Sequence, residues 1–222
     1  MKSSAPSKRT VVQRGPQRAE YDRTVIYQIL DEAFICHVGF VVDGEPVVIP
    51  MSYARMGDRL VIHGSQASRM MRSLEAGVSV CVTVLILDGL VLARSAFDHS
   101  MNYRSVVVFG RAYPLNDTSE KREALRRFSE HICPGRWAEV RQPNDNELRT
   151  TMVLALALEE ASTKIRSGPP VDQKEDYDFP VWAGELPLRL VAGAPVADPQ
   201  MHFPILTPAY VLNYRRPVPH DM

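Results

Sequence analysis

Short apolar runs alternate with turn-forming residues through the first third of the chain. FICHVGFVV and EPVVIPMSYA, residues 34–42 and 45–54, are rich in β-branched residues and flank Asp43-Gly44. Because Asp-Gly accepts the positive φ angles of a type I′ turn, this pattern predicts a hairpin. A second turn at residues 56–58 leads into RLVIHG. Residues 34–64 are therefore predicted to form a three-stranded meander.

Further β runs occupy the middle of the chain. They are VSVCVTVLIL (78–87), LVLARSAF (90–97), SVVVFGRAYPL (105–115) and TTMVLALALEEASTKI (150–165), the last interpreted as one strand. Helical spacing of apolar residues predicts helices over 22–33, 65–76 and 118–132. Asp22 is the expected cap of the first helix, Gly77 ends the second, and Thr118 or Ser119 caps the third. Strands that are mostly sequence neighbours, with a few short helices, predict a small antiparallel barrel, mainly β in an α+β arrangement.

Composition divides the chain into three parts. Residues 1–20 begin with Lys2, Lys8, Arg9, Arg14 and Arg18 and no acid before Glu20, which predicts a disordered basic tail. Residues 21–166 hold the barrel. Residues 167–222 hold ten of the 17 prolines in the interval 169–219 and are predicted to be an extended wrap of the same domain.

Overall charge and cysteine spacing limit the function classes. Lys+Arg and Asp+Glu are equal at 26 each, so no global field favours nucleic acid or an anionic membrane. The longest apolar run, 84–93, is interrupted by Asp88 and Gly89 and is too short to span a bilayer. Three distant cysteines without a CxxC pair, and no apolar signal core, predict reduced thiols in the cytoplasm. The spacing of the histidines does not predict a metal site.

The stretch HGSQASRMMRSLEAG, residues 63–77, combines hydroxyl and guanidinium groups at the start of a predicted helix. Ser65 and Ser68 lie where backbone N–H groups are unpaired, and Arg69 and Arg72 share one helix face. Dipole, amides, hydroxyls and guanidinium together suit a phosphate monoester. The alternative is an ordinary serine-capped helix start with surface arginines.

Three other features carry possible binding chemistry. The polar set in RSAFDHSMNYRSVVVFG, 94–110, can read the edge of a heteroaromatic ring, or it is a structural turn. Pro50 inside a strand predicts an edge or a bulge with free backbone groups, with or without a ligand. Trp182, held between prolines, is expected either to plug its own core or to close a pocket across a dimer.

Taken together, several segments resemble one known family. They are VVIPMSY, LVIHGSQASRMMRSL, VCVTV, DGLVLARSAFDHSMNYRSVVVFGRA and PVWAGELPL. Their order is similar to that of the pyridoxamine 5′-phosphate oxidase-like FMN-binding split-barrel proteins, in the flavin-nucleotide-binding branch related to 5-nitroimidazole reductases. The resemblance covers roughly residues 22 to 190.

This resemblance implies a split β-barrel homodimer with FMN in a cleft at the subunit interface. The residues that it assigns to the cofactor are Pro50, Met51, Ser52, His63, Ser68, Arg69, Tyr103, Arg104, Ser105 and Trp182. Among them, Ser68 and Arg69 match the phosphate grip, residues 50–52 match the strand along the isoalloxazine ring, and Trp182 caps the cofactor. Met70 stands where the oxidases have a lysine, which argues against pyridoxamine phosphate oxidation.

The implied activity is an FMN-dependent oxidoreductase that passes electrons from NAD(P)H or another donor to a small acceptor such as a nitro compound or quinone. No catalytic residue is identified; His63, His99 and Tyr103 are candidates for a proton donor. One alternative is a non-catalytic flavin or haem protein, with His63 or His99 as axial ligand. Another is a reductase that uses a deazaflavin.

Overall fold

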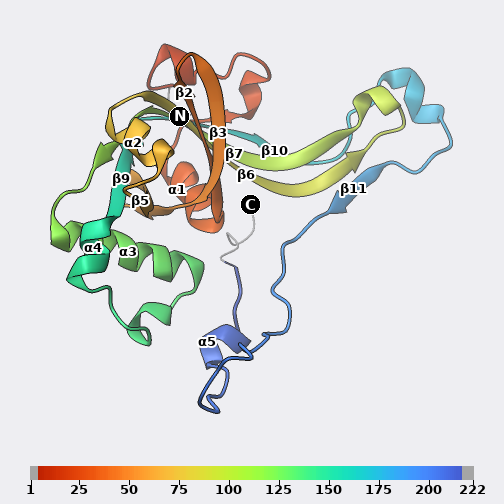
Figure 1. Ribbon diagram of the computed structural model, residues 1–222. Coiled ribbons are helices and arrows are strands. Elements are labelled where there is room, and N and C mark those ends of the chain that lie inside the picture. The colour runs from red at the N-terminus through yellow and green to blue at the C-terminus, as the bar shows by residue number, and fades with distance from the viewer. Residues whose placement is uncertain (1–4, 217–222) are drawn as a thin grey trace.

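The computed structural model describes residues 5–216 of the 222-residue chain, and residues 1–4 and 217–222 lie outside the description. Two antiparallel sheets enclose the core (Figure 1). The larger sheet has the order β1(Ala19–Glu20), β10(Glu160–Arg166), β7(Ser100–Arg111), β6(Ser79–Leu92), β2(Ile35–Val42) and β3(Glu45–Ser52), and β11(Gly184–Pro187) also pairs with β6. The smaller sheet has the order β4(Ala54–Met56), β5(Arg59–Ser65), β9(Thr151–Ala157) and β8(Tyr113–Pro114).

Short helices flank these sheets. They are α1(Arg23–Glu32), α2(Arg69–Glu75), α3(Thr118–Ile132), α4(Asp145–Thr150) and α5(Ala209–Leu212), with 3-10 turns at Lys8–Thr10, Pro16–Arg18, Ala96–Asp98, Arg136–Ala138 and Lys174–Asp178. The predicted fold class, a mainly β split antiparallel barrel with short helices, is confirmed.

The local signals for turns and caps agree with the structure in most places. Asp43 and Gly44 have φ angles of 53° and 84°, as a type I′ turn requires. Asp22 caps α1 through Thr24 N, and Gly77 follows α2 with φ 81°. The cap of α3 is Asp117, whose carboxylate accepts from Glu120 N, so the prediction of Thr118 or Ser119 was wrong by a residue or two.

Strand boundaries differ more from the prediction. The meander breaks at Tyr53, because β4 pairs with β5 and β5 pairs with β9 in the second sheet. The run at 78–87 and the first three residues of the run at 90–97 lie in one strand, β6, with a bulge between Leu87 and Gly89, and residues 96–98 form a 3-10 turn. The single strand expected over 150–165 is two strands, β9 and β10, which belong to different sheets.

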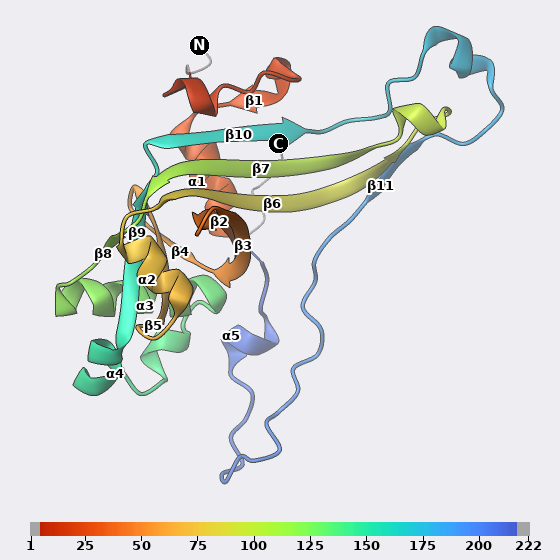
Figure 2. The same cartoon turned by 45° about the horizontal axis from the view of Figure 1, so that its top comes forward.

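Both ends of the chain pack against the barrel. Residues 8–20, for which we predicted disorder, carry two 3-10 turns and β1, and Arg9 pairs with Glu160. Residues 167–216 are largely extended. In Figure 2 they run out along an arm made of residues 87–103 and β11, then descend and return to the barrel through α5.

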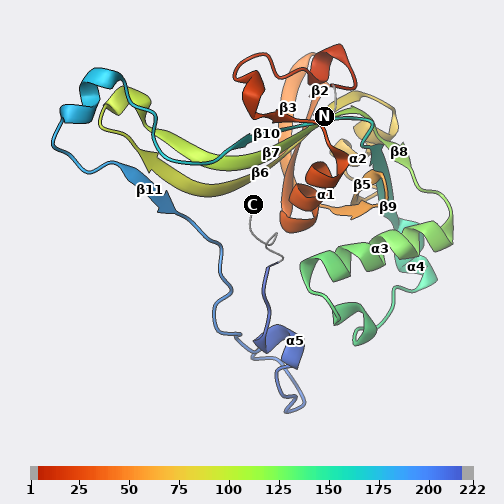
Figure 3. The same ribbon diagram turned by 180° about the vertical axis from the view of Figure 1, so that it is seen from behind.

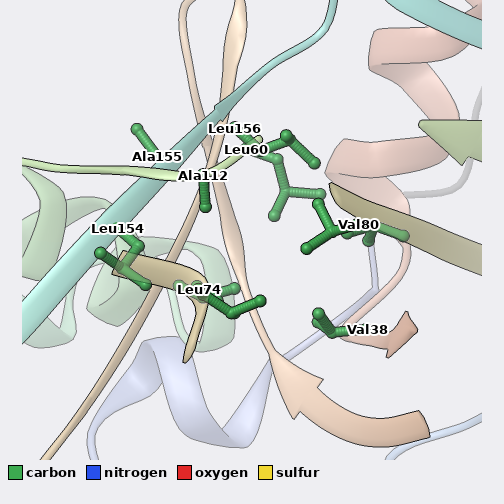
Figure 4. Close-up of a pocket in the computed structure, with 10 residues that line it drawn as sticks. Val38, Leu60, Leu74, Val80, Ala112, Leu154, Ala155 and Leu156 are labelled. Atoms are coloured by element: carbon green, nitrogen blue, oxygen red, sulfur yellow. The ribbon is translucent and has the colours of Figure 1, made fainter. Parts of the chain in front are cut away.

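The barrel interior is filled by apolar side chains. A main cluster includes Leu30, Cys36, Tyr53, Leu74 and Val84, while a smaller cluster, including Phe128 and Val153, lies between the second sheet and α3. The cavity drawn in Figure 4 has a volume of about 10 Å³ and only apolar lining residues. Because it can hold at most one water molecule, this cavity is too small for an organic ligand.

Candidate functional site

The start of α2 places one arginine free for a ligand. The Ser68 hydroxyl accepts from Met71 N at 3.4 Å, and the Ser65 hydroxyl accepts from Ala67 N at 3.1 Å. Arg72 donates to Ala67 O at 3.0 Å. Arg69 is exposed, and its guanidinium makes no hydrogen bond or ion pair with another residue of the described chain; only its carbonyl oxygen accepts from the Ser73 hydroxyl, at 3.0 Å. The turn thus presents a free guanidinium beside two hydroxyls, the groups that bind a phosphate.

His63 lies on the other side of the strand that leads to this turn. Its ring meets Phe128 of α3 edge-on, with 4.3 Å between ring centroids, and its Nδ1 is buried without a partner. Burial lowers the pKa of His63. The next residue, Gly64, faces Met71 of α2. Since neighbouring strand residues point to opposite faces, His63 is directed away from Ser68 and Arg69.

Arg104 is the centre of a buried ionic cluster. Its guanidinium donates to Glu32 Oε1 at 2.9 Å and to the Asp88 carboxylate at 2.7 and 2.9 Å, and its side chain is only 10% exposed. The bonds to Asp88 and then to Glu32 raise the pKa of Arg104. These carboxylates use most of the donors of the guanidinium. In this protomer Arg104 therefore holds α1 to the base of the arm.

Tyr103 and Ser105 lie on the opposite face of β7 from Arg104. The Ser105 hydroxyl donates to Lys164 O at 3.1 Å, whereas Tyr103 pairs with Leu87 across the strands. Asn102, which sequence reasoning placed among possible ring readers, donates to Gly168 O and Glu185 and accepts from Arg166. The polar set around residue 102 thus serves mainly to join the arm to the chain that follows β10.

Pro50, Met51 and Ser52 lie on β3, which is the edge strand of the larger sheet. The prediction of an edge at Pro50 is confirmed, but the pairing with β2 is continuous from Glu45 to Ser52, so the edge carries no bulge. Pro50 is exposed and lies directly opposite His37. The edge leaves backbone groups of β3 accessible, which suits a flat ring laid along it.

His37 is a candidate that the sequence reasoning did not single out. It is exposed on β2 between Pro50 of β3 and Thr83 of β6, and its imidazole makes no hydrogen bond with another described residue. Large apolar side chains are exposed on the same face. We call this surface the outer sheet face: Ile35, His37, Val41, Val48, Pro50, Thr83 and Leu85. The alternation in FICHVGFVV carried the signal, because it puts His37 on the face of Ile35 and Val41.

Trp182 is separated from these groups within one protomer. It is 67% exposed, and its ring lies against Gly184, where a Cβ atom would come within 2.9 Å. Gly184 begins β11 on the arm, whereas α2 lies at the barrel, as Figure 3 shows from behind. The expectation that Trp182 plugs its own core is wrong, since the ring is mostly exposed.

Comparison with protein families gives a clear assignment. The model for pyridoxamine 5′-phosphate oxidase matches residues 22–165. The chain belongs to this family. The matched segment runs from α1 to the end of β10 and so contains both sheets of the barrel. The matched segment therefore includes both Arg69 and the edge strand β3.

Two solved structures are similar over most of the chain. The flavocytochrome Anf3 from Azotobacter vinelandii is 42% identical, with a TM-score of 0.90, and the match covers 96% of this chain and 99% of that one. The FAD and haem binding protein from Mycobacterium smegmatis is 37% identical, with a TM-score of 0.84, over 87% and 95% of the two chains. A putative 5-nitroimidazole antibiotic resistance protein from Bacteroides thetaiotaomicron is 24% identical, with a TM-score of 0.57, over 66% and 86%. It shares the fold.

A search among curated proteins gives no match. In the part of the chain that the structure describes, no helix is long and apolar enough to cross a membrane. Within the same residues, no group of three or more His, Cys, Asp or Glu side chains is placed to hold a metal ion.

Proposed function

We propose that this protein binds a flavin nucleotide and a haem and transfers electrons between them. The observation that carries the proposal is the 42% identity, over 96% of the chain, to a protein whose solved structure is that of a flavocytochrome. The second similar structure is described as binding FAD and haem. Flavin chemistry suits exchange of electron pairs, while haem iron carries one electron at a time.

For the flavin, we propose that Ser68 and Arg69 hold a phosphate and that the isoalloxazine ring lies along Pro50, Met51 and Ser52. The free guanidinium of Arg69 supports this arrangement. FMN is our sequence-based prediction, whereas the Mycobacterium smegmatis relative is described as binding FAD. The same site can take either nucleotide, because both carry a phosphate next to the ribityl chain.

We further propose a homodimer with the cofactor at the subunit interface. Strand β11, which follows Trp182, and helix α2, which begins with Arg69, lie in different parts of the molecule, the arm and the barrel (Figure 1). A second copy can bring the arm of one protomer to α2 of the other. The three cysteines are free, which is in keeping with the reducing cytoplasm that we propose as its location.

For the haem, we propose His37 as an axial ligand. A haem needs an imidazole nitrogen free to bind iron and an apolar surface for the porphyrin. His37 meets both needs, since its imidazole makes no hydrogen bond with a described residue and exposed Ile35, Val48 and Leu85 lie around it. His63 is buried against Phe128. The Nδ1 of His99 accepts from Ala93 N at 3.0 Å, so the neutral ring carries its proton on Nε2 and its only lone pair is already used.

The deciding experiment is the absorption spectrum of the purified protein, with mass spectrometry of the released ligands. We expect flavin bands and a Soret band together, and masses that identify FMN or FAD. A preparation reconstituted with both cofactors that retains neither would overturn the proposal. Anaerobic bleaching by NAD(P)H, followed by reoxidation with a quinone or nitro compound, then tests whether electrons pass from NAD(P)H through the flavin to a small acceptor.

The axial ligand is tested separately with His37→Ala, His99→Ala and His202→Ala. We expect His37→Ala alone to lose the Soret band and at least tenfold in haem affinity, with flavin content unchanged. The variants at positions 99 and 202 are matched controls, since both histidines are also exposed. Loss of haem in either control, with retention in His37→Ala, would contradict the assignment.

A further inference from the structure

Residues 188–208 form a strap that is fixed to its own protomer at both ends. At the first end, Leu188 N donates to Asp88 O at 2.9 Å, next to β11 on the arm. Beyond the second end, the Tyr210 hydroxyl accepts from Arg136 at 3.1 Å and donates to Glu139 at 2.5 Å. Arg216 then donates to Glu32 O at 2.9 Å. The strap therefore forms a closed loop with the arm and the barrel (Figure 2).

Between its two ends the strap is exposed to solvent. Among the described residues, no hydrogen bond joins residues 189–207 to the barrel or to the arm. Its large apolar side chains are exposed, with Phe203 at 72% and Leu206 at 90%. Leu190, Val191, Val196 and Ile205 are exposed as well. Isolated exposed apolar residues are ordinary, but a contiguous series of this kind marks an interaction surface.

The total surface of the chain indicates how much is left to bury. The chain exposes 14191 Å². A compact monomer of 24.9 kDa is expected to expose about 10,200 Å². The excess is about 4,000 Å² per chain, well above the roughly 800 Å² that each partner contributes to a standard interface. For two chains the excess sums to about 8,000 Å², more than the roughly 2,000–5,000 Å² that obligate interfaces commonly bury in total, so the chain has ample surface for protomers that wrap around each other.

The molecule also carries a surface that can receive the strap. The outer sheet face exposes Ile35, Val41, Val48 and Leu85 on adjoining strands. The strap and this face are both exposed in the same protomer, so the strap does not cover its own sheet. A chain that presents two unpaired apolar surfaces can satisfy both with a second copy, because two-fold symmetry forms each contact twice.

We propose that the strap of each protomer crosses the outer sheet face of a second copy of the chain. This inference rests on the proposed homodimer and adds which segment holds it together and which surface receives it. The partner's strap would also shield a group bound at His37 from water. The part of the outer sheet face that a haem at His37 leaves open is thus covered by a segment of this same chain.

The test uses the full-length chain with p-benzoylphenylalanine in place of Phe203. After irradiation, we expect a covalent dimer on a denaturing gel, with the crosslink mapped to peptides that contain residues 35–52 or 79–92. The control carries the same group at Ile132, which is exposed on α3, and should stay monomeric on the gel. Crosslinks only within one chain, none at all, or a monomer in light-scattering measurements would each overturn the proposal.

A second set of variants tests whether the apolar side chains of the strap stabilise the dimer. Phe203→Asp combined with Leu206→Asp should raise the dimer dissociation constant at least tenfold, whereas Val171→Asp, at another exposed apolar position, should not. An unchanged dimer in the double variant would contradict the role of the strap. Flavin and haem content are measured on the same samples. A crosslinked dimer without cofactor would refute the proposed function alone, while a cofactor-loaded protein without the crosslink would refute only the strap.

Discussion

Arg69 and Arg72 are three residues apart on one short helix, yet their environments differ. The Arg72 guanidinium donates to Ala67 O, whereas the Arg69 guanidinium has no partner among the described residues. We predict that Arg69→Ala weakens flavin binding by about 1.5–3 kcal/mol, the range for hydrogen bonds to charged groups. Fluorescence titration with FMN and with FAD measures the change. Arg72→Ala is the matched control and should bind almost normally; equal affinity in Arg69→Ala and the native chain would refute the phosphate assignment.

Arg104 shows the opposite situation, a cation held by two carboxylates. The side chains of Arg104 and Glu32 are 10% and 7% exposed. Removing one member of a buried pair leaves an uncompensated charge, so Arg104→Ala should lower the free energy of unfolding by about 3–5 kcal/mol. Urea denaturation measures this loss. Arg126→Ala, which breaks a surface pair with Glu123, should cost less than about 1 kcal/mol; similar losses in the two variants would show that the cluster is not buried in solution.

At the level of elements, the bulge in β6 decides how the arm is built. Gly89 lies against β11, where an added Cβ would come within 3.0 Å of Leu186 O. A backbone atom cannot yield as a side-chain tip does, so Gly89→Ala should loosen β11. We expect faster hydrogen exchange at residues 184–188. Gly193→Ala, which has no atom within 4 Å of the added Cβ, is the control; unchanged protection in Gly89→Ala would contradict the close contact.

Strand β6 also shows where local sequence patterns fail to predict the structure. The runs at 78–87 and 90–97 read as two strands because Asp88 and Gly89 are turn formers. In the structure, Asp88 accepts from Arg104 and Gly89 packs against β11, so strand β6 continues through a bulge and does not turn back. Both partners are remote from residues 88 and 89 in the sequence. No local window contains the information that makes this site a bulge and not a turn.

Acid sensitivity is a property of the whole molecule. Burial lowers the pKa of His63 and His131, whose rings lie under and on α3. The unfolded chain takes up protons near the ordinary histidine pKa of about 6.5, while the folded chain stays neutral to lower pH. Stability should therefore fall as pH decreases below about 6.5. Chemical denaturation between pH 7.5 and 5 tests this, and His63→Leu should flatten the slope; a pH-independent free energy would contradict it.

The chain also exposes more surface than a compact protein of the same mass would expose. A single protomer has a filled barrel, an arm and a strap whose apolar residues face solvent. The barrel core was foreseeable from apolar patterning, but the unburied surface was not. It emerges only when the positions of the strap and of the outer sheet face are known together.

The sequence by itself determined the type I′ hairpin at Asp43-Gly44, the cap at Asp22, the serine at the start of α2, the split-barrel class and the family. These follow from interactions within a few residues, or from motifs kept in order along the chain. Only the tertiary structure decided that Arg104 is held by Glu32, 72 residues away, that His63 points under α3, and that His37 stands free on an apolar face. Charge pairing, burial and exposure depend on neighbours that packing brings together, and the spacing of residues along the chain does not encode them locally.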